Sequence, residues 1–310
     1  MKVVLAAEES AGAQMLRALA QSEHRVVAVL TEPPEPGSSR FSLWNAAQAL
    51  GYETLPANLV KKSSLAQRLR SDAVDILLNV HSLYLIHDDV LAAPRLGAFN
   101  LHPGPLPRYA GLNVVSWALF RGEQTHGVTV HRIEPRIDAG PIAYQSSFPI
   151  DEEDSALSLS LKCVREGIPL LLRLLEVAAS GESIPSITQD SAKRQYFGRK
   201  VPAGGRISWK WPASKVINFI RACDYFPFDS PWGYPRAQLG VQEVAVVKAR
   251  KTGIDCHVSP GTVGDLTDSG AAVACGDQWI LATKLRLNGR FIPAQGLLKP
   301  GDRLAELDDC

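Results

Sequence analysis

Cysteine is scarce in this chain, and its placement argues against both disulfide and metal chemistry. Five of the 310 residues are cysteine, and none of them forms a CxxC pair or lies at zinc-ligand spacing from a histidine. We therefore predict no metal site. An odd number of scattered cysteines is typical of reduced thiols, so we predict a cytoplasmic protein. The five are Cys163, Cys223, Cys256, Cys275 and Cys310.

Long hydrophobic runs are also lacking. No apolar run approaches the roughly 18 residues that span a bilayer. The apolar opening at residues 1–7 resembles the start of a signal peptide, but it ends at Glu8 and Glu9, which is too short. We interpret it as a buried first strand and predict no membrane partner.

Neither sign of charge dominates. The chain has 33 Lys and Arg against 32 Asp and Glu, a formal net charge of +1. This balance gives no electrostatic case for nucleic acid or a membrane as the main partner, although it leaves a local basic patch open. The sequence does not determine the oligomeric state.

Hydrophobic periodicity in the first half predicts an α/β fold. Residues 2–7 and 25–30 are buried-strand patterns, and residues 10–21 between them have helical spacing, with Ser10 as a candidate N-cap. The pattern then repeats through a helix at 42–50 and a strand at 75–80. We predict a doubly wound, mostly parallel sheet. The first strand-to-helix turn lacks GxGxxG, which argues against a bound dinucleotide.

The second half has a different character. A long amphipathic helix or helix pair at 155–179 is followed by a polar linker. A helix capped by Ser214 and several short strands punctuated by Gly and Asp come next, which is typical of a small OB-like β-barrel. The predicted organisation is a catalytic domain at 1–190, a linker at 191–204 and a β domain at 205–310.

Polar residues with chemical potential gather between positions 100 and 138. Asn100 and His102 lie two apart in a predicted strand, so their side chains project from one face. The prolines that follow, with Gly104 among them, predict a stiff loop at the carboxyl edge of the sheet, where α/β folds place their sites. Asp138 lies in a tight turn after another predicted strand, within reach of a neighbouring histidine. Each residue alone is most often structural, so the pattern leaves both interpretations open.

Together these three side chains suit acyl transfer to an amine. The Asn100 amide can donate to a developing oxyanion, and His102 can exchange a proton near neutral pH. Asp138 can orient the imidazole, favour its charged form and accept the proton that the amine loses. No Ser or Cys lies beside His102 as a nucleophile, which favours direct attack by the substrate amine.

Two sequence blocks resemble the signature of folate-dependent formyltransferases. The first is residues 99–103 (FNLHP) with 106–111 (LPRYAG), and the second is residues 127–131 (GVTVH) with 137–141 (IDAGP). The interval from His102 to Asp138 matches the family's. Residues 205–209 and 217–222 are similar to the second domain of methionyl-tRNA formyltransferase and its sugar- and hydroxyornithine-modifying relatives.

The resemblance implies a 10-formyltetrahydrofolate co-substrate, an amine-bearing acceptor and no metal. Asn100 and a protonated His102 would stabilise the tetrahedral oxyanion, Asp138 would keep His102 charged, and His131 would support them. The implied donor-binding residues are Leu83, Tyr84, Leu85, Ile86, Ile137 and Asp138.

The sequence departs from the family pattern in two ways. Gly104 stands where the family often has Ser or Thr, so water or backbone must replace a hydroxyl contact. Residues 31–40 hold two acids and one base, where methionyl-tRNA enzymes carry a basic insertion. Because phosphate contacts dominate nucleic-acid affinity, we favour a small or carrier-linked amine as the acceptor, such as a nucleotide amino sugar, an ornithine derivative or an aminoacyl carrier.

Three alternatives remain, namely methionyl-tRNA formylation, 10-formyltetrahydrofolate hydrolysis and non-catalytic folate binding. An aromatic stretch at 224–234 is either a packed loop or a stacking platform for substrate. The candidate substrate-binding residues are Arg108, Tyr109, Tyr225, Phe226 and Trp232.

Overall fold

The computed structural model describes residues 1–37 and 41–307, and the chain forms two compact units that are described separately below. The first unit is Met1–Gly111, Gly127–Phe148 and Lys162–Tyr196. The second unit is Leu112–His126, Pro149–Leu161 and the chain from Phe197 onward. Each unit is assembled from several stretches, so the boundaries near 190 and 205 stay a prediction. Residues 38–40 of the acidic stretch and Cys310 lie outside the described residues.

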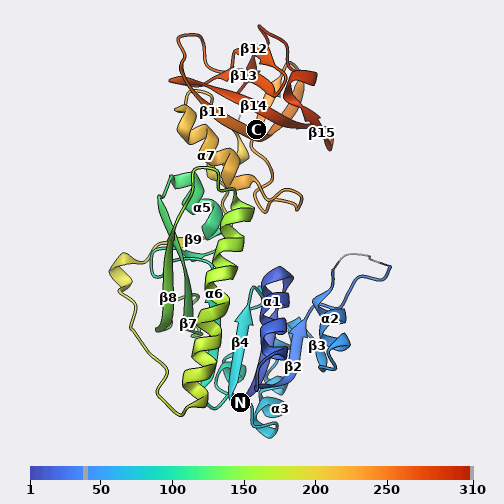
Figure 1. The fold of residues 1–310 in the computed structure, drawn as a ribbon, viewed down its shortest axis with the longest axis vertical. Coiled ribbons are helices and arrows are strands. Elements are labelled where there is room, and N and C mark those ends of the chain that lie inside the picture. Colours follow the sequence, from blue (N-terminus) through green and yellow to red (C-terminus); the bar gives the residue numbers. More distant parts are fainter. Residues whose placement is uncertain (38–40, 308–310) are drawn as a thin grey trace. The chain divides into compact units, whose positions relative to one another are not determined.

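A seven-stranded sheet forms the centre of the first unit, in the order β3-β2-β1-β4-β5-β7-β8 (Figure 1). Pairing is parallel from β3 through β5, and β5 pairs with β7 antiparallel. The predicted mostly parallel α/β sheet is therefore confirmed. Its strands are β1 (Lys2–Ala7), β2 (Arg25–Thr31), β3 (Thr54–Pro56), β4 (Ile76–Val80), β5 (Gly97–His102), β7 (Thr125–Arg132) and β8 (Ile142–Pro149).

Continuous burial explains why these segments form inner strands. All of β1 after Lys2 is buried, as is most of β4. Strands covered on both faces carry unbroken apolar runs, as the sequence pattern indicated. One core cluster joins β1, β2 and β4 to the helices around them. The helices in this cluster are α3 (Ser63–Ser71) and α4 (Asp88–Leu91), and the first unit also contains α1 (Glu9–Ala20) and α2 (Leu43–Ala49).

Two details of the helices differ from the sequence prediction. Ser10 lies inside α1, and the N-cap is Glu8, whose carboxylate accepts from Glu32 N (2.8 Å) and Thr31 Oγ1 (3.1 Å) instead of capping the helix. The acid is thereby anchored to the end of β2. The long amphipathic segment is a single helix, α6 (Ala156–Ala179), with Pro169 inside it.

The second unit contains α5 (Val114–Arg121), α7 (Ala213–Cys223) and a curled antiparallel sheet in the order β12-β13-β14-β11-β10-β16, with β15 paired to β14 (Figure 1). This half-barrel confirms the predicted OB-like β domain. Ser214 does not cap α7, because Asp277 Oδ1 accepts from Ala213 N at 2.7 Å. The strands are β10 (Arg236–Leu239), β11 (Gln242–Asp255), β12 (Val263–Thr267), β13 (Gly270–Ala274), β14 (Gln278–Leu287), β15 (Arg290–Pro293) and β16 (Leu304–Ala305).

The remaining elements are short. β6 (Ala110–Gly111) and β9 (Tyr196–Phe197) form a two-stranded sheet. Four 3-10 turns complete the described chain, at Ala57–Lys61, Ser191–Lys193, Pro202–Gly205 and Ala294–Gly296. Within residues 1–37 and 41–307, no helix combines the length and the apolar character that crossing a bilayer requires. Four cysteines in this range are buried free thiols, namely Cys163, Cys223, Cys256 and Cys275.

Candidate functional site

Three polar residues, called the polar row below, lie side by side on β4, β5 and β7, near the carboxyl ends of β4 and β5. Asn79 of β4 is in register with Asn100 of β5, and Asn100 is in register with His131 of β7. Directly opposed residues project to the same face of a sheet. His102 lies two residues after Asn100 in β5, so its side chain projects from the same face. Its ring packs edge-to-face on the His131 ring, with 6.3 Å between the centroids.

Hydrogen bonds fix the orientation of the Asn100 amide. Asn79 Nδ2 donates to Asn100 Oδ1 (2.9 Å), and Asn100 Nδ2 lies 3.2 Å from His131 Nε2. The other ring nitrogen of His131, Nδ1, must donate to the Arg132 carbonyl (2.8 Å), because a carbonyl only accepts. In the tautomer with its hydrogen on Nδ1, His131 accepts from Asn100 through Nε2. Asn100 thus uses Oδ1 and one N–H of Nδ2 in these bonds. Its second N–H has no partner among the described residues.

Asp138 joins this row from the turn that follows β7. Its carboxylate lies between the two imidazoles, with Oδ1 3.4 Å from His131 Nε2 and Oδ2 3.6 Å from His102 Nδ1. Oδ2 also accepts from Gly111 N at 2.8 Å. The residue has a φ of 49°, a left-handed conformation that Asp and Asn adopt more readily than most residues. Thus Asn100, His102 and Asp138, from three separate positions in the chain, lie together.

The backbone of the Asp138 turn is held by two side chains from residues 189–194. Gln189 Nε2 donates to the carbonyls of Asp138 (3.0 Å) and Gly140 (2.7 Å). Arg194 donates to the carbonyls of Asp138 (3.2 Å) and Ile137 (2.7 Å). These bonds fix the turn from outside the strands that carry the other site residues.

His102 is almost fully buried, with 4% of its surface exposed. Its Nε2 lies 2.5 Å from the Tyr109 carbonyl, so this nitrogen carries the hydrogen. Gly104 makes the approach feasible, because a Cβ at that position would lie 2.7 Å from Tyr109 O and 2.8 Å from His102 Nε2. A backbone carbonyl thus contacts the histidine beside the glycine that departs from the family pattern.

The loop that covers His102 is anchored to the neighbouring strands. Thr129 Oγ1 donates to the Gly104 carbonyl (2.7 Å) and accepts from Leu106 N (3.2 Å). Gln145 Nε2 donates to Thr129 Oγ1 (2.8 Å) and to the Leu106 carbonyl (2.9 Å). The loop conformation is therefore fixed by buried Thr129 of β7 and exposed Gln145 of β8 as well as by its prolines.

The pKa values of His102 and Asp138 are both lowered, but for different reasons. Burial lowers the pKa of His102, and the opposing effect of the Asp138 carboxylate is smaller. For Asp138, burial alone would raise the pKa, but His102, His131 and the Gly111 N–H outweigh it and hold the pKa well below the usual range. Asp138 thus favours the charged form of His102, as expected, but burial of the imidazole has the larger effect on its pKa.

The implied donor-binding segment follows β4, next to the polar row. Leu83 and Leu85 are strongly exposed, at 85% and 69% of their surfaces, and Ile137 is 40% exposed. Tyr84 and Ile86 instead pack against the core cluster of the sheet. Alternating exposure of this kind leaves two leucines on the surface near the carboxyl end of β4.

The five predicted substrate-binding residues have different surroundings. Tyr109 has a buried side chain and meets His102 through its carbonyl, while the Arg108 guanidinium lies over the Tyr109 ring at 5.6 Å. The other three belong to the second unit. The Tyr225 hydroxyl forms a hydrogen bond with the Ser116 hydroxyl (3.1 Å), Phe226 packs edge-to-face on Phe291, and buried Trp232 packs edge-to-face on Trp117. These contacts favour a packed loop for the aromatic stretch.

Asn79, Thr129 and Gln145 support the site residues, although the sequence did not predict a role for them. Asn79 carried a usable signal, because a single Asn interrupts the apolar β4 run one residue before its end. Thr129 and Gln145 lie in alternating strands where polar residues are expected, so nothing in the local pattern marks them. The Tyr109 carbonyl has no side-chain signature at all.

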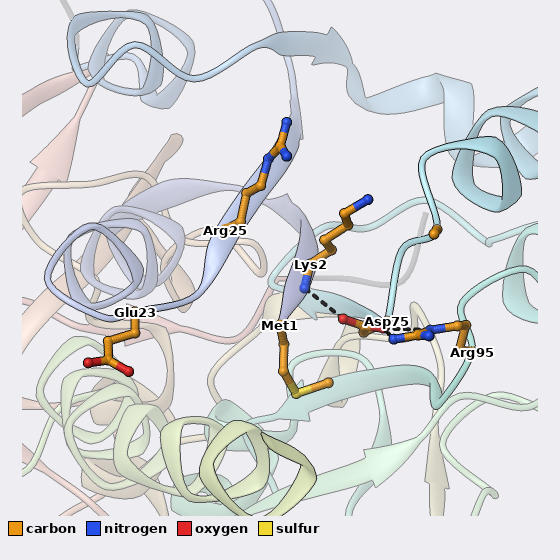
Figure 2. Close-up of a pocket in the computed structure, with 7 residues that line it drawn as sticks. Met1, Lys2, Glu23, Arg25, Asp75 and Arg95 are labelled. Carbon is orange, nitrogen blue, oxygen red and sulfur yellow. Dashed lines mark hydrogen bonds and ion pairs between the residues drawn. The ribbon is translucent and has the colours of Figure 1, made fainter. Parts of the chain in front are cut away.

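A separate cavity of about 350 Å³ opens at the amino ends of β1, β2 and β4 (Figure 2). Asp75 there accepts from Lys2 N (2.8 Å) and pairs with the Arg95 guanidinium, as Figure 2 shows. Its buried carboxylate is thus satisfied by neighbours, which indicates a structural role. Among residues 1–37 and 41–307, no group of three or more His, Cys, Asp or Glu is arranged to hold a metal ion.

Solved structures share this fold at low sequence identity. An N-formyltransferase from Helicobacter canadensis in complex with folinic acid and dTDP-3-aminofucose aligns with a TM-score of 0.67 and 18% identity, covering 91% of this chain and 98% of that one. HypX from Aquifex aeolicus in complex with tetrahydrofolic acid aligns at 0.68 and 18%, covering 96% of this chain and 46% of that one. A 4-N formyltransferase from Francisella tularensis gives 0.61 and 15%, covering 74% and 90%.

Two family models match the sequence directly. The formyl transferase model matches residues 1–175, and the model of the formyl transferase C-terminal domain matches residues 200–299. The matched regions contain the polar row with Asp138 and most of the curled sheet. The chain belongs to the formyl transferase family.

Proposed function

We propose that this protein transfers the formyl group of 10-formyltetrahydrofolate to the amine of a small or carrier-linked acceptor. The observation that carries the proposal is the convergence of Asn100, His102 and Asp138 at one edge of the sheet, with an amide N–H still unpartnered. Solved relatives named as N-formyltransferases, and bound to a folate and a nucleotide amino sugar, support it. Candidate acceptors are a nucleotide amino sugar, an ornithine derivative and an aminoacyl carrier.

The geometry supports direct attack of the amine on the formyl carbon. A C–N bond forms, the carbonyl oxygen takes the negative charge, and the Asn100 N–H stabilises it. His102 contributes a second donor at Nε2 once the acceptor or the formyl oxygen displaces the Tyr109 carbonyl. This donation works with a neutral imidazole, in keeping with its lowered pKa.

Asp138 supplies the negative charge that the attacking nitrogen needs. As the amine adds, positive charge develops on its nitrogen, and an ionised carboxylate nearby stabilises that charge. The proton then passes from this nitrogen through water toward the leaving N10 of the folate as the old C–N bond breaks. His131 lies against both Asn100 and Asp138 and accepts from the Asn100 amide, which suits a positioning role.

The test separates the proposal from its alternatives. Purified protein is incubated with 10-formyltetrahydrofolate and a panel of primary and hydroxyl amines, and tetrahydrofolate release is followed. We expect release that depends on a particular amine. Equal release without amine would identify a hydrolase, release only with initiator methionyl-tRNA would identify a tRNA enzyme, and donor binding without release would identify a folate-binding protein.

Replacing Asn100 tests the mechanism itself. We expect Asn100→Ala to lower turnover about 10²–10³-fold while leaving the Kd for the folate donor nearly unchanged, because the amide acts on the oxyanion that forms only during reaction. Asn45→Ala, an exposed amide change in the same unit, is the control. Undiminished turnover in Asn100→Ala would remove this residue from the mechanism.

A further inference from the structure

The curled sheet of the second unit carries a cavity of about 570 Å³ that the formyl transfer mechanism does not use. All of its lining residues lie between Val201 and Gly289, within the second unit. Its volume is within the range of about 300–1,000 Å³ typical of small-molecule sites. The volume does not identify a ligand, but the side chains that line the cavity indicate its chemistry.

Two arginines converge on the cavity from one row of the sheet. Arg236 of β10 is in register with Ala245 of β11, and Ala245 is in register with Arg286 of β14. Opposed residues share a face, so both guanidinium groups flank the small Ala245 side chain. Only one acid lines the cavity, Glu243, and it pairs with Arg236 (3.3 Å). The lining therefore keeps one positive charge in excess.

Two donors in this lining are buried without a partner. Trp232 is 7% exposed, and its Nε1–H has no hydrogen-bond partner among the described residues; the same holds for buried Arg286 Nε. Buried donors in folded proteins are nearly always satisfied by protein, water or ligand. Both residues line the cavity and both unsatisfied atoms are donors, so a ligand that brings acceptor atoms would complement them.

Aromatic walls and an open rim complete the site. Tyr234 is buried, and the Arg286 guanidinium lies over its ring at 5.9 Å. The turn from β14 to β15 has positive φ at Asn288 (49°) and Gly289 (78°), and no atom lies within 4 Å of where a Gly289 side chain would begin. The mouth is thus unobstructed at that turn, and the 6% of Tyr234 that is exposed belongs to a residue of the cavity wall.

We propose that this cavity binds a small organic anion, whose phosphate or carboxylate group accepts from Trp232 Nε1 and Arg286 and whose flat part packs against Tyr234. The excess positive charge selects the anion, because a neutral ligand would leave the Arg286 charge uncompensated in a partly desolvated site. Charge-assisted hydrogen bonds are about twice as strong as neutral ones, which makes Arg286 the main anchor.

Calorimetric titration of the full-length protein tests the proposal without any assay of formyl transfer. The probes share one ring and differ in charge: phenyl phosphate, benzoate and neutral benzyl alcohol, each taken to about 10 mM so that a Kd of about 1 mM is measurable. Binding of either anion, and not of the alcohol, supports the site. The anion with the lower Kd identifies whether the site prefers a phosphate or a carboxylate. Absence of binding by both anions would overturn it.

Variants locate the binding in this cavity. Trp232→Phe keeps the ring packing and removes one donor, so we expect about 2–10-fold weaker binding, and Arg286→Gln should weaken binding by about 10-fold or more. Arg290→Gln, an exposed change on β15 outside the lining, is the control and should bind as the parent does. If Arg286→Gln fails to fold, Arg286→Lys retains the charge and loses the Nε donor. Unchanged affinity in the Trp232 and Arg286 variants would overturn the assignment.

Discussion

The two sites proposed for this molecule differ in how far their polar atoms are satisfied. At the edge of the parallel sheet, Asn100, His102 and Asp138 are engaged by each other, by His131 and by backbone groups. In the cavity of the curled sheet, Trp232 and Arg286 bury donors that have no described partner. The first arrangement is organised before any ligand arrives, which suits catalysis, whereas the second is completed only by a ligand.

The largest expected effect comes from removing one charge at the organised site. Asp138→Asn keeps the shape, tolerates the positive φ and can still accept from Gly111 N, but it loses the negative charge between the imidazoles. We expect formyl transfer to fall by about 10³-fold or more, near the upper end of acid–base effects. The melting temperature should change little. The measurement is steady-state kinetics beside a thermal melt.

The control for this substitution is Asp265→Asn, which changes an exposed acid of β12, outside the Asp138 turn. It should leave turnover unaltered. A large drop in the melting temperature of Asp138→Asn would instead make Asp138 a structural residue, and the contrast between the two sites would then rest on His102 and Asn100 alone.

The next effect concerns the close approach of backbone to His102. Gly104→Ala would place a methyl group 2.7 Å from Tyr109 O and 2.8 Å from His102 Nε2, so the loop or the ring must shift. Overpacking of this kind lowers the free energy of unfolding by about 1–3 kcal/mol. Chemical denaturation measures the change.

Gly296→Ala is the matched glycine control, because its nearest neighbour would be 3.8 Å away and its φ is not positive. We expect it to be neutral. Equal stability of Gly104→Ala and the parent would show that the Tyr109–His102 contact is not tightly packed in solution.

The smallest effect is a pH dependence of stability. Burial lowers the pKa of folded His102, whereas an unfolded histidine titrates at about 6.5. Below that pH the unfolded state binds the extra proton, so stability falls as pH decreases from about 6.5 through the lower folded pKa. His102→Gln should flatten this decline in denaturation curves at pH 7, 6 and 5. His257→Gln, at an exposed position, should leave the slope as it is.

Much of the fold and the core of the site could be predicted, because they follow from local rules. Alternation in β5 placed Asn100 and His102 on one face, and the turn pattern placed Asp138 at a strand end. Contacts that depend on register between distant strands could not be predicted. The Asn79–Asn100 pairing is one example, and the Arg236–Ala245–Arg286 row is another, because its members are far apart in the sequence.

The N-caps of α1 and α7 and the protonation state of His102 could not be predicted from the sequence, for physical reasons. Ser10 and Ser214 have the right residue type for caps, but Glu8 precedes the first helix, and Asp277 from the turn before β14 accepts from the first N–H of the second. The charge on His102 depends on the balance between desolvation and one carboxylate, and that balance is set by burial, which residue identity does not reveal.

The bonds from Gln189 and Arg194 to the Asp138 turn have a practical consequence for anyone who wants to produce the catalytic half alone. A fragment ending at residue 175, where the first family match stops, would omit both side chains and free the turn that carries the carboxylate. A minimal fragment should run at least through Tyr196, the last residue of the first unit. The polar segment after the long helix thus supports the site, and a shortened gene would have to encode it.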